Sequence, residues 1–186
     1  RRYEVTERLN ERGAVHEQLD EASVEAIADD LADVDSVAVS LLYSFENDAH
    51  EQRVRELLEA QGVDASFSLS SRVLPEIREY ERTLTTSLNA ALKPVMDSYI
   101  SRLGSRIAEE GVDADLKIMQ SNGGIITADA ARDRPVNTLL SGPAGGVQGA
   151  TYVAGLAGIE DCITMDMGGT SCDVSLVQGG EPLVTT

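Results

Sequence analysis

Two kinds of hydrophobic spacing organise the first part of the chain. Residues 36–44 (SVAVSLLYS) form a nearly continuous apolar run, which is typical of a strand buried on both faces. A helical pattern follows over about 48–61 and ends at Gly62, and a second strand is expected near 65–69. The order of strand, helix and strand predicts a βαβ unit with a parallel pair of strands.

The residues before this unit predict a hairpin and a helix. Short strands are expected near 3–9 and 14–18, around a turn at 10–13. Asp20 suits the N-cap of a helix that runs to about residue 32. The apolar positions of that helix are Val24, Ile27, Ala28 and Leu31.

The segment 75–110 has a helical pattern throughout. Pro75 suits a first helical turn, and Pro94 is expected to divide the segment into two helices or to kink it. An apolar stripe predicts a packed helix face made of Leu84, Leu88, Leu92, Val95, Met96, Tyr99 and Leu103.

Strands and short helices are expected to alternate after residue 115. A strand at 116–120 (LKIMQ) leads directly into the loop SNGG at 121–124. A short helix is expected at 128–132 and a further strand at 136–141.

The last part of the chain predicts a helix packed beside a hairpin. Small residues fill 142–158 and permit a helix that approaches a neighbour closely. The segment 162–177 then gives a strand, a bend and a second strand, and the glycines at 179–180 turn the chain into a last strand.

Composition adds an aliphatic core and a strongly acidic surface. The chain is 42% hydrophobic but only 4% aromatic, with no Trp, so the core must be aliphatic. The formal net charge of −17 argues against binding a nucleic-acid backbone or an anionic membrane. With Lys93 and Lys117 the only lysines, the composition favours halophilic adaptation over an acidic docking surface.

The remaining bulk features predict a piece of a longer protein with buried cysteines. No apolar run is long enough to span a membrane. Cys162 and Cys172 lie in apolar strand-like runs and lack metal or redox spacing, so we expect small buried side chains in a reducing compartment. Both ends of the chain read as strands, and we therefore expect it to be part of a longer protein.

The bend in MDMGGTSCDVSLV (165–177) carries the residue types that grip a polyphosphate. Gly168 and Gly169 leave backbone N–H groups unobstructed, and the hydroxyls of Thr170 and Ser171 can add hydrogen bonds. Asp166, at the end of the first strand, can hold hydrated Mg²⁺. On spacing alone, an ordinary hairpin with glycines at its bend explains the same pattern.

The order of motifs decides between these interpretations. A strand–DxGGT–strand unit preceded by a small-residue helix resembles the second phosphate loop of the actin, sugar kinase and chaperone ATPase superfamily. In order, LPEIREYERT, IMQSNGG, LLSGPAGGV and DMGGTSCDVSLV resemble the hydantoinase A/5-oxoprolinase family, and SFENDAHE resembles an earlier family segment. Cys172 departs from the Thr expected there, which replaces a hydroxyl with a thiol.

The resemblance implies ATP and Mg²⁺ as cofactors and assigns roles by matched position. Asp166 would be the catalytic residue and would orient Mg²⁺ through water. The phosphate contacts would come from Gly168, Gly169, Thr170, Ser171, Gly145 and Gly146. Weaker candidates are the SNGG loop and the returning strand, represented by Asn122, Gly123, Gly124 and Asp173.

The implied fold is an α/β, actin-like (ribonuclease H-like) ATPase lobe with a mixed sheet and flanking helices, cut from a larger two-lobe protein. Residues 1–82 would end the family's N-terminal region and hold the βαβ unit. Residues 83–186 would begin the catalytic domain and hold the second phosphate hairpin.

The implied activity is ATP-dependent ring opening of a small cyclic amide, such as a hydantoin or 5-oxoproline, in the cytoplasm and with a second, B-type subunit. An ATP-using subunit of a ketone carboxylase and a non-enzymatic protein with an actin-like fold stay open as alternatives. The family's first phosphate hairpin is absent from this sequence. We therefore expect the isolated chain to lack ATPase activity and to bind nucleotide weakly at best.

Overall fold

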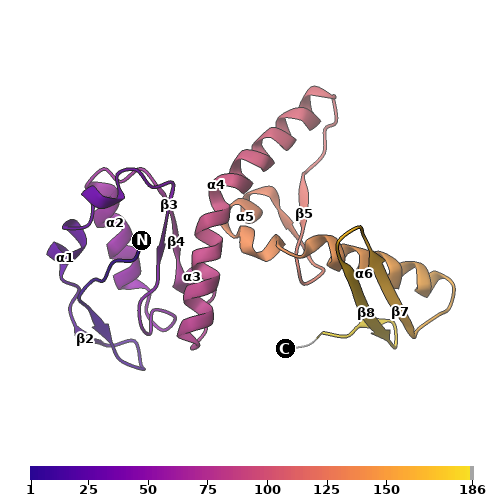
Figure 1. Ribbon diagram of the computed structural model, residues 1–186, viewed down its shortest axis with the longest axis horizontal. Coiled ribbons are helices and arrows are strands. Elements are labelled where there is room, and N and C mark those ends of the chain that lie inside the picture. Colours follow the sequence, from indigo (N-terminus) through magenta and orange to yellow (C-terminus); the bar gives the residue numbers. More distant parts are fainter. Residues whose placement is uncertain (185–186) are drawn as a thin grey trace. The chain divides into compact units, whose positions relative to one another are not determined.

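The computed structural model describes residues 1–184 of the chain (Figure 1). These residues form an α/β structure with both parallel and antiparallel strand pairs, which confirms the predicted fold class. They cluster into two compact units, one ending at Leu103 and the other beginning at Gly104. The predicted division of the chain at residue 82 stays a prediction.

The first unit begins with the expected hairpin. β1 (Arg8–Leu9) pairs antiparallel with β2 (Val15–Glu17). The side-chain oxygen of Asn10 accepts hydrogen bonds from the backbone N–H groups of Arg12 and Ala14, both at 3.0 Å. One short polar side chain therefore holds the turn together, although both strands are shorter than predicted.

The helix after this hairpin is capped as predicted but ends early. The carboxylate of Asp20 accepts a hydrogen bond from the N–H of Ala22 at 3.2 Å, and α1 spans Glu21–Glu25. The chain then continues in turns and a 3₁₀ helix, η1 (Asp29–Leu31). Val24 and Leu31 are nevertheless buried, so the apolar spacing found the core positions correctly.

A βαβ unit forms the centre of the first unit, as the apolar pattern predicted. β3 (Ser36–Val39) and β4 (Ser66–Leu69) pair in parallel, and α2 (Ala49–Ala60) connects them. β3 is shorter than the apolar run 36–44, because the chain turns after it and Tyr43 has a φ of 57°. The core between these elements is aliphatic, with buried Val24, Ala28, Leu31, Val39, Val54, Leu57, Leu58, Val63 and Leu69.

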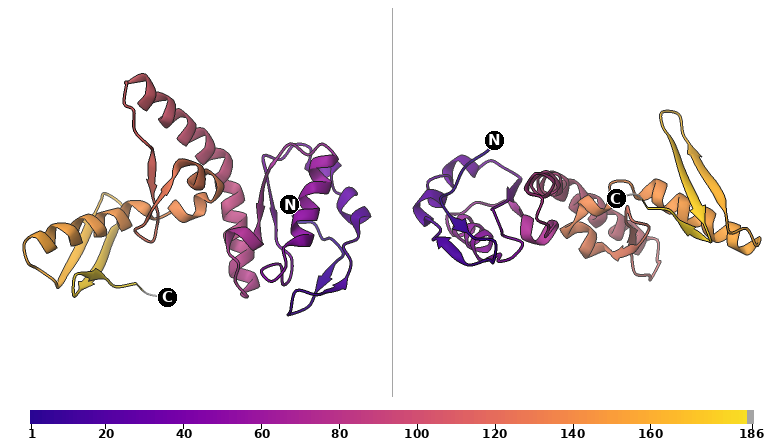
Figure 2. Two further views of the ribbon diagram at one scale, coloured as in Figure 1. Left: turned by 180° about the vertical axis from the view of Figure 1, so that it is seen from behind. Right: turned by 90° about the horizontal axis from the view of Figure 1, so that it is seen from below.

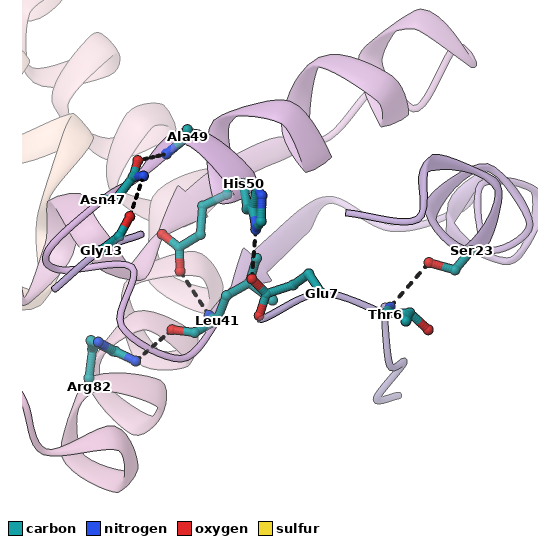
Figure 3. A network of polar contacts seen from close by, with 10 residues as sticks. Thr6, Glu7, Gly13, Ser23, Leu41, Asn47, Ala49, His50 and Arg82 are labelled. Atoms are coloured by element: carbon teal, nitrogen blue, oxygen red, sulfur yellow. Dashed lines mark hydrogen bonds and ion pairs between the residues drawn. The ribbon is translucent and has the colours of Figure 1, made fainter. Parts of the chain in front are cut away.

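Polar side chains with specific partners link α2 to the segments that follow β3 and β4, and Figure 3 shows several of these contacts. Glu51, on α2, is fully buried, and its carboxylate accepts hydrogen bonds from the N–H of Leu41 at 3.0 Å and of Ser71 at 2.9 Å. The hydroxyls of Ser70 and Ser71 donate to the same carboxylate. The neighbouring His50 contacts Glu7 at 2.7 Å.

The long helix after β4 packs through polar and small residues rather than through the predicted stripe. α3 (Ser70–Val73) is a single turn. α4 (Glu79–Glu109) is one helix that continues through Pro94, so the prediction of two helices divided at that residue was wrong. Pro75 lies before α4 and not in its first turn, so that prediction was wrong.

Four of the seven residues of the predicted stripe, Leu84, Leu88, Val95 and Tyr99, are between 43% and 65% accessible. The other three, Leu92, Met96 and Leu103, are half-buried. The buried positions of α4 are instead Arg82, Thr86, Asn89, Ala90 and Ile100. The buried polar side chains have hydrogen-bond partners, and Arg82 donates to the carbonyl of Leu41 just after β3. Asn89, for example, donates to the hydroxyl of Ser68 at 3.0 Å.

The second unit begins with a small hairpin and two short helices. β5 (Lys117–Met119) pairs antiparallel with β6 (Ile125–Thr127), and α5 (Ala128–Asp133) follows with Thr127 as its N-cap. A 3₁₀ helix, η2 (Pro135–Thr138), stands where the sequence predicted a strand at 136–141. Pro135 explains the error, because its fixed φ and missing N–H suit the start of a helix.

The remaining elements confirm the predicted helix and hairpin. α6 (Ser141–Leu156) precedes β7 (Cys162–Met167), which pairs antiparallel with β8 (Cys172–Gln178), and β9 (Glu181–Pro182) pairs with β8 (Figure 2). Only Ala131, Pro135 and Val177 are buried among residues 104–184. The described part of this unit therefore has a thin core of its own.

Candidate functional site

The bend at Gly168–Ser171 is a tight reversal between two regular strands. Register pairs Met167 with Cys172, and the N–H of Gly168 donates to the carbonyl of Ser171 at 3.0 Å. The predicted site residues Gly168, Gly169, Thr170 and Ser171 therefore lie together at one end of the β7–β8 hairpin.

The backbone conformation of this bend does not require glycine at either position. Neither Gly168 nor Gly169 has a φ in the left-handed region that favours glycine in many hairpin turns. A Cβ atom placed on Gly169 would meet no other atom within 4 Å, and one on Gly168 would approach only the Ser171 carbonyl, at 3.9 Å. The backbone at the bend is therefore open to an approaching ligand.

Asp166 lies on the side of the hairpin that faces α6. A Cβ atom placed on Gly146 would lie 3.8 Å from Oδ2 of Asp166, so the carboxylate stands beside the first turns of α6. Gly145, one residue earlier, faces β5 instead, where a Cβ atom would lie 3.6 Å from Cγ of Met119. The structure thus brings Gly146, but not Gly145, next to Asp166.

Two carboxylates face each other across the hairpin. Asp166 and Asp173 are directly opposed in the strand register and both are exposed. Within the described residues, neither carboxylate has an ion pair or a side-chain hydrogen bond. Because like charges directly opposite each other are destabilising, this pair favours a cation nearby.

The SNGG loop is held firmly but on another side of α6. The hydroxyl of Ser121 donates to the carbonyl of Asn137 at 2.9 Å, and Gly123 has a φ of +82°. A Cβ atom on Gly123 would lie only 2.5 Å from Nε2 of Gln148, so this loop rests on α6 at that residue.

Helical geometry separates the loop from the carboxylates. Positions 146 and 148 are two residues apart on α6, and residues at that spacing do not share a helix face. The loop therefore contacts one side of α6 and Asp166 another. Gly123 thus packs against Gln148 rather than against Asp166.

Gln148 is the contact residue that sequence reasoning missed. It packs against Gly123 from the middle of α6. Its signal in the sequence was its polarity, because 142–158 otherwise consists almost entirely of small and apolar residues.

The cysteines differ from the prediction of buried side chains. Cys162 is half-buried and Cys172 is exposed, and neither forms a disulfide among the described residues. Their positions in strands are as predicted, but the face of the hairpin that carries Cys172 is uncovered.

Residues 1–184 contain neither a cluster of metal-ligating side chains nor a membrane-spanning helix. No group of three or more His, Cys, Asp or Glu side chains is placed to hold a metal ion in this part of the chain. No helix of these residues is long and apolar enough to cross a membrane.

Sequence and structure comparisons identify relatives along the whole chain. Caprolactamase subunit alpha of Pseudomonas jessenii is 41% identical over 93% of the chain, and the solved ATP-dependent caprolactamase of that organism superposes with a TM-score of 0.84 over 92% of the chain. A nucleotide-free acetone carboxylase structure superposes with a TM-score of 0.83 at 34% identity over 95% of the chain. 5-oxoprolinase 1 of Arabidopsis thaliana is 38% identical over 78% of the chain.

These relatives are much longer than this chain. It spans 25% of the caprolactamase subunit, 26% of the acetone carboxylase chain and 11% of the plant protein. The family model for the hydantoinase/oxoprolinase N-terminal region matches residues 1–62. The hydantoinase/oxoprolinase model matches residues 82–186, which is more than half of the sequence. The chain belongs to the hydantoinase/oxoprolinase family.

Proposed function

We propose that the bend between β7 and β8 binds phosphates of ATP in an enzyme that opens cyclic amides. This proposal rests on the open backbone at Gly168 and Gly169. The conformation of the turn does not require glycine at either position. Names of the relatives support it, since one is an ATP-dependent caprolactamase and another a 5-oxoprolinase. We further propose that this enzyme acts with a second subunit and that its substrate is a small cyclic amide.

Each residue of the bend has a role that follows from its chemistry. The N–H group of Gly169 can donate to a phosphate oxygen, because no side chain at this position screens the backbone and a Cβ atom there would meet no other atom within 4 Å. The exposed hydroxyls of Thr170 and Ser171 can add further hydrogen bonds to phosphate. Gly146 leaves room between α6 and the Asp166 carboxylate, where a larger side chain would intrude.

The acidic pair fits Mg²⁺, which binds proteins through one or two carboxylates and keeps most of its waters. Asp166 and Asp173 supply two such groups on one face of the hairpin. ATP would supply a transferable phosphoryl group, and its Mg²⁺ ion would supply the positive charge opposite these carboxylates. The work of the protein in such chemistry is mainly to position the phosphates and to neutralise charge.

The binding test needs a protein of the length that the relatives have, which we call the family-length protein. Gly169→Ala should weaken nucleotide binding at least about tenfold in calorimetry, because a methyl group would occupy the ligand's space and one lost interaction is worth about 1.4 kcal/mol. Gly149→Ala is the matched control, since a Cβ atom there also meets nothing within 4 Å but lies in α6. Unchanged affinity in Gly169→Ala would refute the role of the bend.

The isolated chain should not hydrolyse ATP, because it carries one phosphate-binding bend and lacks the family's first phosphate hairpin, which would hold the nucleotide from the other side. This expectation would be overturned if the purified chain hydrolysed ATP at a rate that Asp166→Ala abolishes. The assay is ADP release, with Asp129→Ala as a control for an exposed carboxylate elsewhere in the same unit.

A carboxylase function is the second candidate, and the likeness to acetone carboxylase favours it. The family-length protein, assayed with its partner subunit, should release ADP with hydantoins, 5-oxoproline or caprolactam and open their rings. ADP release with a ketone and bicarbonate, and with none of the cyclic amides, would establish the carboxylase alternative instead.

A further inference from the structure

The SNGG loop caps the N-terminus of α6 from a distance. The N-cap residue of α6 is Leu140, whose apolar side chain forms no capping hydrogen bond. The hydroxyl of Ser121 instead accepts a hydrogen bond from the N–H of Leu140 at 3.2 Å and donates to the carbonyl of Asn137 at 2.9 Å. Ser121 therefore satisfies the N–H of the N-cap residue, as a Glu three residues into a helix does in a capping box.

Two further contacts hold α6 against the β5–β6 hairpin. Gln148 occupies the space where a Cβ atom of Gly123 would stand, and a Cβ atom on Gly145 would lie 3.6 Å from Cγ of Met119 on β5. Positions 145 and 148 are three residues apart, so they share one face of the helix. The hairpin and its loop thus fix α6 at its start and along its next two turns.

The other side of α6 meets the Asp166 carboxylate. Gly146 is the residue of α6 next to this carboxylate, with 3.8 Å between a Cβ atom placed there and Oδ2. It lies about 200° around the helix axis from Gln148, because each residue turns the helix by about 100°. Displacement of the first turns of α6 would therefore change the space beside Asp166.

We propose that Ser121 is a positioning residue for the nucleotide site. Its hydroxyl fixes the start of α6 and, through the helix, the space between Gly146 and the Asp166 carboxylate. This inference rests on the proposed function, in which that carboxylate holds hydrated Mg²⁺. The hydroxyl is engaged by two backbone groups of the segment that leads into α6, so Ser121 acts on the site through the helix and not by contact with phosphate.

The test measures ATP binding to the family-length protein by calorimetry, once with Mg²⁺ and once in EDTA. Ser121→Ala should weaken binding about two- to tenfold with Mg²⁺, which corresponds to the net worth of one hydrogen bond. It should leave the affinity in EDTA unchanged, because the displaced group is the carboxylate that holds the metal. Ser121→Thr keeps the hydroxyl and should bind ATP as the unaltered protein does.

Thr127→Ala is the matched control for a loss of stability alone. The Thr127 hydroxyl also accepts from a backbone N–H, that of Ala130, at 3.2 Å, and both side chains belong to exposed residues, but Thr127 caps α5. The two alanine variants should lower the melting temperature alike, and only Ser121→Ala should weaken binding with Mg²⁺. Hydrogen exchange in the peptide 137–146 should accelerate in Ser121→Ala and not in Thr127→Ala.

The outcomes separate this inference from the proposed function. Unchanged affinity in Ser121→Ala, with weaker binding in Gly169→Ala, would overturn the positioning role and leave the phosphate role of the bend standing. Equal losses with Mg²⁺ and in EDTA, or in Ser121→Ala and Thr127→Ala, would also overturn the positioning role. Unchanged affinity in both Ser121→Ala and Gly169→Ala would refute the proposed function and this inference together. If Ser121→Ala does not fold, Ser121→Cys, whose thiol accepts more weakly, replaces it with the same expected results.

Discussion

Gly123 shows how one residue can satisfy two demands at once. Its φ of +82° suits glycine, and the space where a Cβ atom would stand is taken by Gln148. The loop therefore packs against α6 with no room for a Cβ atom unless the Gln148 side chain moves. A turn signal in the sequence indicates the first demand, but the second depends on the packing of a residue 25 positions away.

Replacing this glycine should destabilise the second unit. Gly123→Ala introduces an unfavourable backbone conformation and a contact of 2.5 Å with Gln148, and we expect a loss of about 1–3 kcal/mol in the free energy of unfolding, measured with urea. Adding Gln148→Ala should recover the part that comes from the clash. If the double variant recovered everything, backbone strain would play no part. Gly149→Ala is the control and should be neutral or slightly stabilising.

At the level of elements, Glu51 joins the ends of two parallel strands to the helix that connects them. Its buried carboxylate accepts from the backbone after β3 and from the start of α3 after β4. Removing it would leave buried N–H and hydroxyl donors without an acceptor. That outcome costs more than the net value of the hydrogen bonds themselves.

Glu51→Ala should therefore lower the free energy of unfolding by about 3 kcal/mol or more, as measured by urea unfolding followed by circular dichroism. Glu51→Gln should cost less, since its carbonyl oxygen still accepts. The control is Glu59→Ala on the same helix, whose exposed pair with Arg55 should contribute less than about 0.5 kcal/mol. Equal losses in both alanine variants would contradict the role of Glu51.

The exposed pair between α1 and α2 gives a pH dependence. A hydrogen bond from Arg53, at 2.7 Å, lowers the pKa of Glu21 below its usual value of 4.5. Because the pKa in the folded state lies below that in the unfolded state, the stabilisation is present above pH 4.5 and is lost as the pH falls through the folded value.

Glu21→Gln should abolish that acid-side loss of stability while leaving the fold intact. The measurement is the urea midpoint as a function of pH at low salt, with Glu25→Gln on the same helix as the control. An unchanged pH dependence in Glu21→Gln would show that solvent screens the pair completely.

The whole molecule is dominated by its charge. With 32 acidic and 15 basic side chains, repulsion opposes the compact state, and salt screens it. We expect the melting temperature to rise steadily as KCl is increased toward molar concentrations. This is the behaviour that halophilic adaptation predicts, and a flat or falling curve would count against it. Sucrose at matched osmolality is the control, because it stabilises without screening charge.

The sequence predicted those parts of the fold that local spacing determines. The βαβ unit follows from one apolar run and its flanking periodicities, and the β7–β8 hairpin follows from alternation around two glycines. The segment 136–141 was predicted wrongly because its apolar residues outweighed the helix-starting Pro135.

The prediction failed where the outcome depends on what covers a surface. The stripe at Leu84, Leu88, Val95 and Tyr99 is exposed, because α4 meets the sheet through Arg82 and Asn89 instead. Figure 3 shows the guanidinium of Arg82 reaching the carbonyl of Leu41, a contact between residues 41 positions apart that no periodicity reveals. The order of motifs along the sequence was enough to predict the residues at the bend. That Asp166 and Asp173 face each other became visible only from the strand register in the structure.

The exposed methionines of the hairpin have a chemical consequence. Met165 and Met167 are 64% and 70% accessible, and peroxide converts such side chains into polar sulfoxides. A preparation of the isolated chain should therefore accumulate mass increments on the peptide that contains this strand during storage in air.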